Sequence, residues 1–199
     1  MKKEVRTLTT KLNIPKTRDG SVSRSRLLNL IDQGLDRKLT LICAPAGSGK
    51  TTIASEWAGC SELPVAWVSL DTYDDDFLRF WSGIVASLDQ RVPGLSQQIS
   101  STLNSVNPSF YQPFIVQLLQ ELCNQQSRLV LLLDDYHVIE SATIHASLAY
   151  FVERVPEGFH CYILSRFEPP LPLPRLIVKG DLLRIHGEDM NFTEAESAM

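Results

Sequence analysis

The sequence predicts an α/β protein, a three-layer αβα sandwich around a mainly parallel sheet of five strands. Short apolar runs alternate along the chain with longer stretches in which apolar residues recur at helical spacing. The first of these runs leads directly into a glycine-containing loop and then into a helical pattern. Such alternation favours a doubly wound sheet whose functional residues gather at the carboxyl ends of its strands.

In the first half of the chain, apolar spacing and helix stop signals define the elements. The expected elements are a helix over Arg24–Gln33, a strand from Lys38, a helix over Thr51–Gly59 and a strand over Val65–Leu70. Gly34 ends the first helix, as glycine commonly does. Three aspartates, Asp74 to Asp76, precede a helical pattern from Phe77 to Leu88, and we expect them to cap that helix.

In the second half, an aliphatic run gives the clearest strand. Leu129–Leu133 is continuous and bounded by charge, which is typical of a parallel strand covered on both faces. The other expected elements are helices over Pro113–Asn124 and Ser141–Val155 and strands over Cys161–Leu164 and Leu182–Ile185. Ser96–Pro108 is polar and predicts no element.

Residues 44–52 read Ala-Pro-Ala-Gly-Ser-Gly-Lys-Thr-Thr and predict a phosphate-binding loop of the Walker A type. Its glycines let consecutive backbone N–H groups point at phosphate oxygens, and the following helix adds its positive end. The expected nucleotide-binding residues are Ala46, Gly47, Ser48, Gly49, Lys50, Thr51 and Thr52. Lys50 would reach the β- and γ-phosphates, and the Thr51 hydroxyl would ligate Mg²⁺. Ala44 stands where the standard pattern has its first glycine.

A dinucleotide-binding turn is the competing interpretation of this loop. Gly47-Ser-Gly49 begins such a fingerprint, and Asp71 closes the next strand where a ribose-binding acid would lie. The third glycine of the fingerprint is replaced by Thr52, and Lys50 has no role in that scheme. We therefore favour the phosphate loop and assign Asp71 a structural role.

Two further strand ends supply residues for the same site. The strand Leu129–Leu133 leads into Asp134 and Asp135, an arrangement of the Walker B type. Asp134 would hold the Mg²⁺ of ATP or ADP, directly or through water, and Asp135 would orient or deprotonate the water that attacks the γ-phosphate. Arg166 follows a third strand and would contact the γ-phosphate, which would distinguish ATP from ADP.

Composition sets limits on partners and location. The chain has 199 residues, 44% hydrophobic and 21% charged, and a net charge of −4. A DNA-binding surface needs clustered Lys and Arg, so we expect no DNA binding by this segment itself. The amino terminus has no apolar core of a signal peptide, and no run is long enough to span a membrane, so we expect a cytoplasmic protein. The four scattered cysteines are expected to be buried small apolar residues.

The ordered set of motifs resembles the amino-terminal ATPase domain of MalT-like regulators. It consists of Val22-Ser-Arg24-Ser-Arg26-Leu-Leu, Ala44–Thr52, Trp67-Val-Ser-Leu-Asp71 with Asp74–Phe80, Leu132-Leu-Asp-Asp-Tyr136-His137, and Ile163-Leu-Ser-Arg166. These large LuxR-type transcription activators belong to the signal-transduction ATPases with numerous domains, P-loop NTPases related to AAA proteins. The resemblance covers about Lys11 to Met199 and implies the strand order 5-1-4-3-2.

The resemblance also implies a function, an ATP-driven switch. ADP would hold the resting form, while an inducer and ATP would favour self-association of the full-length protein and promoter binding. Arg24 would be the contact from the Val22–Arg26 segment to adenine or phosphates. We expect an arm over residues 1–20 and an ATPase domain over 21–199, with the winged-helix region to follow. A capping box at Thr193–Glu196, close to the last residue, supports a continuation.

Two other functions stay open at this point. The same loop could belong to a free-standing ATPase or small-molecule kinase, although the sequence identifies neither an acceptor pocket nor a lid. The chain could also be a fragment of the regulator that folds without activity of its own.

Overall fold

Five parallel strands form the centre of the molecule, in the order β2-β3-β4-β1-β5. The structure is a computed structural model, and it describes residues 9–16, 24–124 and 128–191. The strands are β1 (Leu39–Cys43), β2 (Val65–Ser69), β3 (Leu129–Asp134), β4 (Phe159–Ser165) and β5 (Leu182–His186). All four neighbouring pairs are parallel. The predicted fold class and the predicted order, counted from the other edge, are confirmed.

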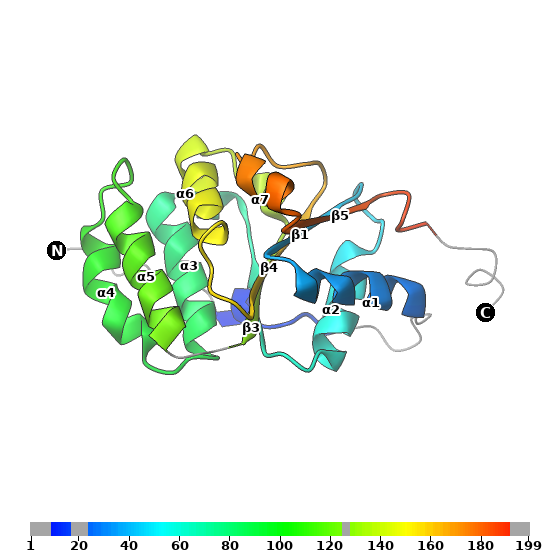
Figure 1. The fold of residues 1–199 in the computed structure, drawn as a ribbon, viewed down its shortest axis with the longest axis horizontal. Helices are drawn as coiled ribbons and strands as arrows, with labels where there is room; N and C mark the ends of the chain where they lie inside the picture. Colours follow the sequence, from blue (N-terminus) through cyan, green and yellow to red (C-terminus); the bar gives the residue numbers. More distant parts are fainter. Residues whose placement is uncertain (1–8, 17–23, 125–127, 192–199) are drawn as a thin grey trace.

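Helices cover both faces of this sheet (Figure 1). The helices α1 (Ser25–Asp32) and α2 (Lys50–Cys60) lie on one face, and α3 (Phe77–Asp89), α5 (Gln112–Asn124) and α6 (Ala142–Val152) lie on the other. A short helix, α7 (Pro174–Lys179), precedes β5. Within β3, residues 129, 131 and 133 pack with the second group, while 130 and 132 pack with the first. Because successive strand residues point to opposite faces, an all-apolar strand fits this buried position.

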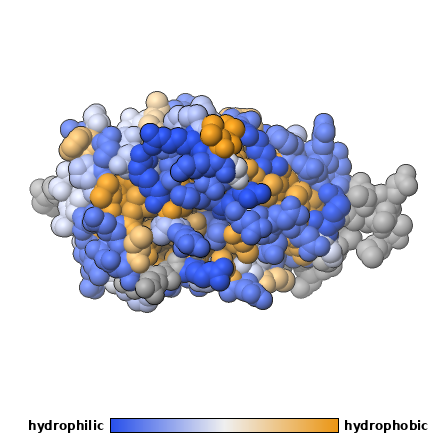
Figure 2. Space-filling view, viewed as in Figure 1, coloured by the Kyte–Doolittle hydropathy of each residue, from blue (hydrophilic) through white to orange (hydrophobic). Residues whose placement is uncertain are grey.

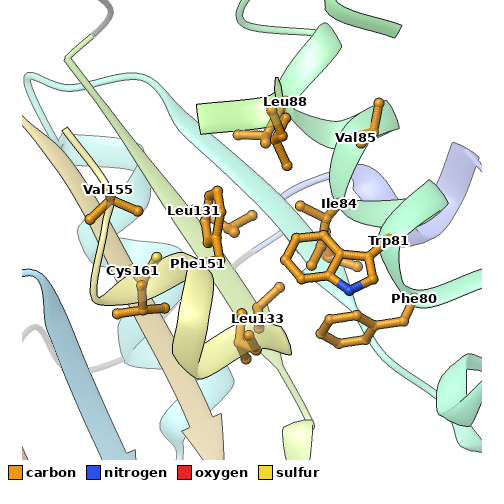
Figure 3. Packing of buried hydrophobic residues seen from close by; sticks show 14 of the residues in the cluster. Phe80, Trp81, Ile84, Val85, Leu88, Leu131, Leu133, Phe151, Val155 and Cys161 are labelled. Carbon is orange, nitrogen blue, oxygen red and sulfur yellow. The ribbon is translucent and has the colours of Figure 1, made fainter. Parts of the chain in front are cut away.

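Large aromatic side chains fix both layers against the sheet. Trp81 of α3 packs edge-on against Phe80 and Phe151 (Figure 3) and also against Phe114, with ring centroids 5.5–5.6 Å apart. Its indole Nε1 donates to Ser147 Oγ of α6 at 3.0 Å, so the buried polar group is satisfied. On the opposite face, Trp57 of α2 stacks on a β4 tyrosine at 4.7 Å. The Trp81 contacts join α3, α5 and α6 to one another, and the Trp57 contact joins α2 to the sheet.

The segment over Ser96–Pro108, where the sequence was uninformative, contains a helix. The helix α4 (Leu95–Ser105) packs on α3 and α5 and lies outermost in that layer (Figure 1). Leu95, Ile99 and Leu103 are buried and recur every four residues, which places them on one face. This apolar stripe is narrow because α4 packs only on other helices and not on the sheet. The serines and glutamines between the apolar residues make the helical pattern hard to recognise in the sequence.

The aspartates that follow β2 have different structural roles. The expectation that Asp74 to Asp76 together cap α3 was therefore wrong. Only Asp76 caps that helix, by accepting the N–H of residue 79 at 3.0 Å. Asp74 and Asp71 close a capping box over the preceding 3-10 turn, and the ammonium of Lys11 lies 2.6–2.7 Å from both. Asp75 accepts two backbone N–H groups ahead of α6. Asp71 therefore has the structural role that was predicted.

The cysteines are not all buried, contrary to expectation. Cys161 is buried and Cys43 is partly buried, but Cys60 and Cys123 are exposed near the ends of α2 and α5. Figure 2 shows a largely hydrophilic face with an apolar patch over α7, where Ile177 and Val178 are exposed. None of the helices in the described part of the chain has the length and apolar character needed to cross a membrane. The predicted capping box near the carboxyl terminus lies outside the described residues.

Candidate functional site

The loop between β1 and α2 has the backbone that a phosphate-binding loop requires. Gly47 and Gly49 have φ angles of 79° and 84°, in the left-handed region that favours glycine. A Cβ added to either glycine would meet no other atom within 4 Å, so the requirement is conformational. The helix α2 begins at Lys50, directly after this turn. Its free N–H groups and positive end face the same space as the loop.

Ala44 is compatible with this loop even though the standard pattern has glycine there. Among the described residues, Asp135 is the one non-glycine position with a positive φ, so Ala44 has an ordinary backbone conformation. Its N–H donates to the carbonyl oxygen of Ser165 at 3.2 Å, which prolongs the β1–β4 pairing by one residue. A side-chain methyl group is therefore tolerated at this point.

The side chain of Lys50, the first residue of α2, folds back onto the phosphate loop that precedes it. Its Nζ donates to the carbonyl oxygens of Ala44 at 2.6 Å and Pro45 at 2.9 Å, and the residue is buried. Burial lowers the pKa of Lys50, while the nearby charges of Asp135 and Asp134 oppose that shift. These neighbours keep a compact positive charge at the mouth of the loop, where a phosphate oxygen could replace a carbonyl as acceptor.

Thr51 and Asp134 meet across the sheet edge. The Thr51 hydroxyl is 3.2 and 3.0 Å from the two carboxylate oxygens of Asp134, which is 3% exposed. Burial and the neighbouring Asp135 raise the pKa of Asp134 to about 6, although Thr51 and Lys50 act in the opposite direction. A buried carboxylate that is costly to ionise, beside a hydroxyl oxygen, is a fitting ligand pair for a divalent cation.

Mg²⁺ would need further ligands at this pair. In the described ranges, no group of three or more His, Cys, Asp or Glu side chains comes together in a way that could hold a metal. Mg²⁺ in nucleotide sites is commonly bound by one or two protein groups, water and phosphate oxygens. Thr51 and Asp134 therefore fit a cation that arrives with a nucleotide.

Asp135 adopts an unusual backbone conformation at the end of β3. Its φ is 56°, in the left-handed region, and its own N–H donates to Asp134 Oδ1 at 2.9 Å. This turn leaves the Asp135 side chain half exposed at the edge of the sheet, while Asp134 points into the site. Asp adopts positive φ more readily than most residues with a side chain, so the turn is accessible to it, and its catalytic role stays a prediction.

His137 belongs to this cluster, although no role was predicted for it. Its Nδ1 lies 3.7 Å from Asp135 Oδ1, and its ring contacts Phe167 edge-on at 6.2 Å. Burial lowers the pKa of His137, and the positive charges of Arg166 and Lys50 act in the same direction. The signal available in the sequence was its position two residues after the paired aspartates.

Arg166 follows β4, which lies between β3 and β1 in the sheet. Its charge lowers the pKa of both Lys50 and His137, so its guanidinium lies on the same side as the phosphate loop and the paired aspartates. The residue itself is exposed, free to approach a bound anion. The structure thus brings three predicted strand ends together.

The remaining predicted nucleotide contacts lie around the loop. Ala46 and Thr52 are exposed, and Ser48 is half buried with no hydrogen-bond partner for its hydroxyl among the described residues. Arg24 is buried, and its Nη2 donates to the carbonyl oxygens of Met190 at 2.8 Å and of residue 191 at 2.7 Å. Contact of Arg24 with a nucleotide stays a prediction.

Comparison with solved structures agrees with this architecture. The chain is similar to a Walker-type ATPase of Pyrococcus abyssi, with a TM-score of 0.53 and 14% identity over 96% of this chain and 59% of that one. A similarity to PCH-2 of C. elegans has a TM-score of 0.43 and 13% identity over 81% of this chain and 41% of that one. No family model matches the chain. The first similarity shows a P-loop ATPase fold, and the chain spans 59% of that ATPase's length.

Proposed function

We propose that this chain is the ATP-binding, slowly hydrolysing switch module of a MalT-like transcription regulator. The observation that carries the ATP-binding part is the pairing of Thr51 with Asp134 beside Lys50. A loop of free N–H groups, a lysine and a hydroxyl–carboxylate pair are the parts that bind the phosphates and cation of Mg-ATP. The MalT-like assignment rests on the ordered motif set described above.

The site favours slow hydrolysis over rapid turnover. Asp135 would orient a water at the γ-phosphate, but its carboxylate is half exposed, and its Oδ1 lies 3.7 Å from Nδ1 of His137, whose pKa is lowered. Phosphoryl transfer depends mainly on positioning and charge neutralisation. A loosely held base therefore suits an enzyme that retains its nucleotide and uses hydrolysis to reset a state.

The free energy of the expected γ-phosphate contacts is large enough to drive a two-state switch. Moving a two-state equilibrium from 1:99 to 99:1 takes about 5.5 kcal/mol of differential binding. Charge-assisted hydrogen bonds contribute about 1.5–3 kcal/mol each. Two or three contacts to the γ-phosphate, from Lys50, Arg166 and the bound cation, would supply this difference between ATP and ADP.

Other parts of a larger regulator would carry the remaining functions. The net charge of −4 does not favour DNA binding by this segment, so promoter recognition would belong elsewhere. Self-association would require the full-length protein in its ATP-bound form. The proposed ligands of this chain are ATP, ADP and Mg²⁺, and its proposed location is the cytoplasm.

Steady-state and single-turnover hydrolysis test this proposal against a free-standing enzyme. We expect slow release of phosphate from ATP, tight retention of ADP and no transfer to small-molecule acceptors. Rapid phosphoryl transfer to an acceptor would contradict the switch and favour a kinase. Tight ATP binding without any hydrolysis would contradict the hydrolysing part of the proposal. It would favour a nucleotide-binding module that switches without ATP cleavage.

A further inference from the structure

The position of the Asp135 carboxylate depends on the backbone of the turn after β3. Within the part of the chain that the structure describes, this carboxylate accepts no hydrogen bond, and its Oδ1 lies 3.7 Å from Nδ1 of His137, beyond hydrogen-bond distance. The backbone of Asp135 leads directly into a 3-10 turn over Tyr136–Val138. The direction of the carboxylate therefore follows from how firmly this turn is held.

Tyr136, the next residue, anchors the turn in the core. Its side chain is fully buried, and its ring packs edge-on against Phe80 of α3 at 6.3 Å. Its hydroxyl oxygen lies 2.8 Å from Nδ1 of His145 on α6, and His145 is also buried. This contact joins the residue that follows Asp135 to a helix of the layer that covers the sheet (Figure 1).

The protonation states of the two rings suit a hydrogen bond from Tyr136 to His145. Burial raises the pKa of Tyr136 and lowers the pKa of His145, while the Asp75 charge adds to the first shift and opposes the second. At neutral pH the phenol keeps its proton and the imidazole is neutral, so Nδ1 can accept from the hydroxyl. A satisfied buried polar pair fixes its members in one arrangement, which apolar packing alone does less strictly.

Asp75 holds the other end of the same segment. Its Oδ1 accepts the N–H groups of Glu140 and Ser141 at 2.9 and 2.8 Å, just before α6. Inside the segment, two N–H groups donate to the carbonyl oxygens of Asp135 and Tyr136 at 3.1 Å. Of the side-chain contacts that hold this segment, the one made by the Tyr136 hydroxyl is the closest in sequence to Asp135.

We propose that Tyr136 and His145 are positioning residues for ATP hydrolysis. Their hydrogen bond holds the turn so that the Asp135 carboxylate faces the water that attacks the γ-phosphate. They touch neither the nucleotide nor the cation and act through Asp135. Displacement of a catalytic group by about 1 Å can slow a reaction about 100-fold, so the hold on the backbone matters. This inference rests on the proposed hydrolysis and names what orients its base.

Single-turnover hydrolysis and equilibrium ATP binding by the 199-residue chain test this pair. Tyr136→Phe keeps the ring and removes the hydroxyl, and it should slow hydrolysis about tenfold while ATP affinity stays within about twofold of the parent value. His145→Leu removes the acceptor and should have the same two effects. His145→Asn offers an amide oxygen near the Nδ1 position and should recover most of the rate.

Ser147→Ala is the matched control, because it removes another buried hydrogen bond of α6, the one from the Trp81 indole at 3.0 Å. It should lower the melting temperature as Tyr136→Phe does and leave the hydrolysis rate unchanged. A double variant shows whether the effect passes through Asp135. In an Asp135→Asn background, Tyr136→Phe should slow hydrolysis no further, because the carboxylate that it positions is gone.

Several results would overturn the positioning role. Hydrolysis at the parent rate by Tyr136→Phe and His145→Leu is one, and equal slowing by Ser147→Ala or a further loss in the Asp135→Asn background is another. If Tyr136→Phe does not fold, the two His145 variants decide, and equal rates for them would contradict the proposal. A parent chain that does not hydrolyse ATP at all would instead overturn the proposed function on which this inference rests.

Discussion

Thr51 and Asp134 form a hydrogen-bonded pair across β4, although 83 residues separate them in sequence. Thr51 follows the phosphate loop after β1, and Asp134 ends β3, so the pair closes the space over the carboxyl end of the intervening strand. The contact joins the predicted phosphate loop to the predicted cation ligand. Burial and the neighbouring Asp135 raise the pKa of Asp134 to about 6 despite this contact, so keeping the carboxylate ionised destabilises the protein without ligand.

Asp134→Asn is expected to stabilise the ligand-free protein while weakening Mg-nucleotide binding. The raised pKa means that ionising Asp134 costs more in the folded than in the unfolded chain, by up to about 3 kcal/mol for about two pKa units. An amide retains an acceptor for Thr51 without the charge. Chemical denaturation at pH 7 should show a gain of about 1–2 kcal/mol, since the amide keeps only one of the two oxygen acceptors. Calorimetry should show that added Mg²⁺ no longer strengthens nucleotide binding.

The pH dependence of this stabilisation has a definite sign. A carboxyl group whose pKa is higher in the folded protein binds its proton more tightly there, so the parent loses stability as pH rises from about 4 to about 6. Asp134→Asn does not titrate at this position. The difference in melting temperature between variant and parent should thus be small at pH 4 and largest above pH 6. A difference that does not change with pH would contradict the assignment.

Lys50→Ala is expected to lose nucleotide affinity by about 10- to 100-fold. Each charge-assisted bond to phosphate contributes about 1.5–3 kcal/mol, and Lys50 is the cation within the loop. Lys179→Ala, on an exposed lysine of α7, is the matched control and should bind as the parent does. Fluorescence titration with a labelled ATP analogue measures both variants. Undiminished binding by Lys50→Ala would contradict the phosphate-loop assignment.

Asp135→Asn is expected to retain ATP and to slow its hydrolysis about 100-fold or more. Asparagine tolerates the left-handed conformation found here, φ 56°, so the turn should persist, but an amide is a poor base. Asp36→Asn, exposed at the opposite end of the sheet, serves as the control. Single-turnover phosphate release and equilibrium binding separate the two effects. Hydrolysis at the parent rate would show that Asp135 has no role in the chemical step.

Arg166→Ala is expected to reduce the preference for ATP over ADP. The guanidinium of Arg166 lowers the pKa of both Lys50 and His137, so it lies near the loop, and we expect it to contact the γ-phosphate that ADP lacks. Competition binding should show ATP affinity falling about tenfold while ADP affinity changes less than twofold. Arg175→Ala, on an exposed arginine of α7, should leave both unchanged. Parallel losses for ATP and ADP would argue against a role in discrimination.

The sequence predicted the sheet and the strand-end residues because buried parallel strands have a strong, continuous apolar signal. The strand Leu129–Asp134 could be recognised without any tertiary information. Because the carboxyl ends of parallel strands meet at one edge of the sheet, Asp134 could then be predicted to lie near the phosphate loop. The helix α4 escaped prediction because second-layer packing requires only three apolar residues in eleven. The carbonyl contacts of Arg24 could not be foreseen either, because they depend on a turn 166 residues away.

Thermal unfolding of the 199-residue chain with and without Mg-ATP tests the central claim most directly. A ligand at 100 times its dissociation constant adds about 2.7 kcal/mol of stability. For a chain of this size, that corresponds to a rise of about 5–10 °C in melting temperature. We predict such a rise with millimolar Mg-ATP, and a smaller one with ATP and a chelator. An unchanged melting temperature at millimolar Mg-ATP would contradict the claim that this fold binds ATP.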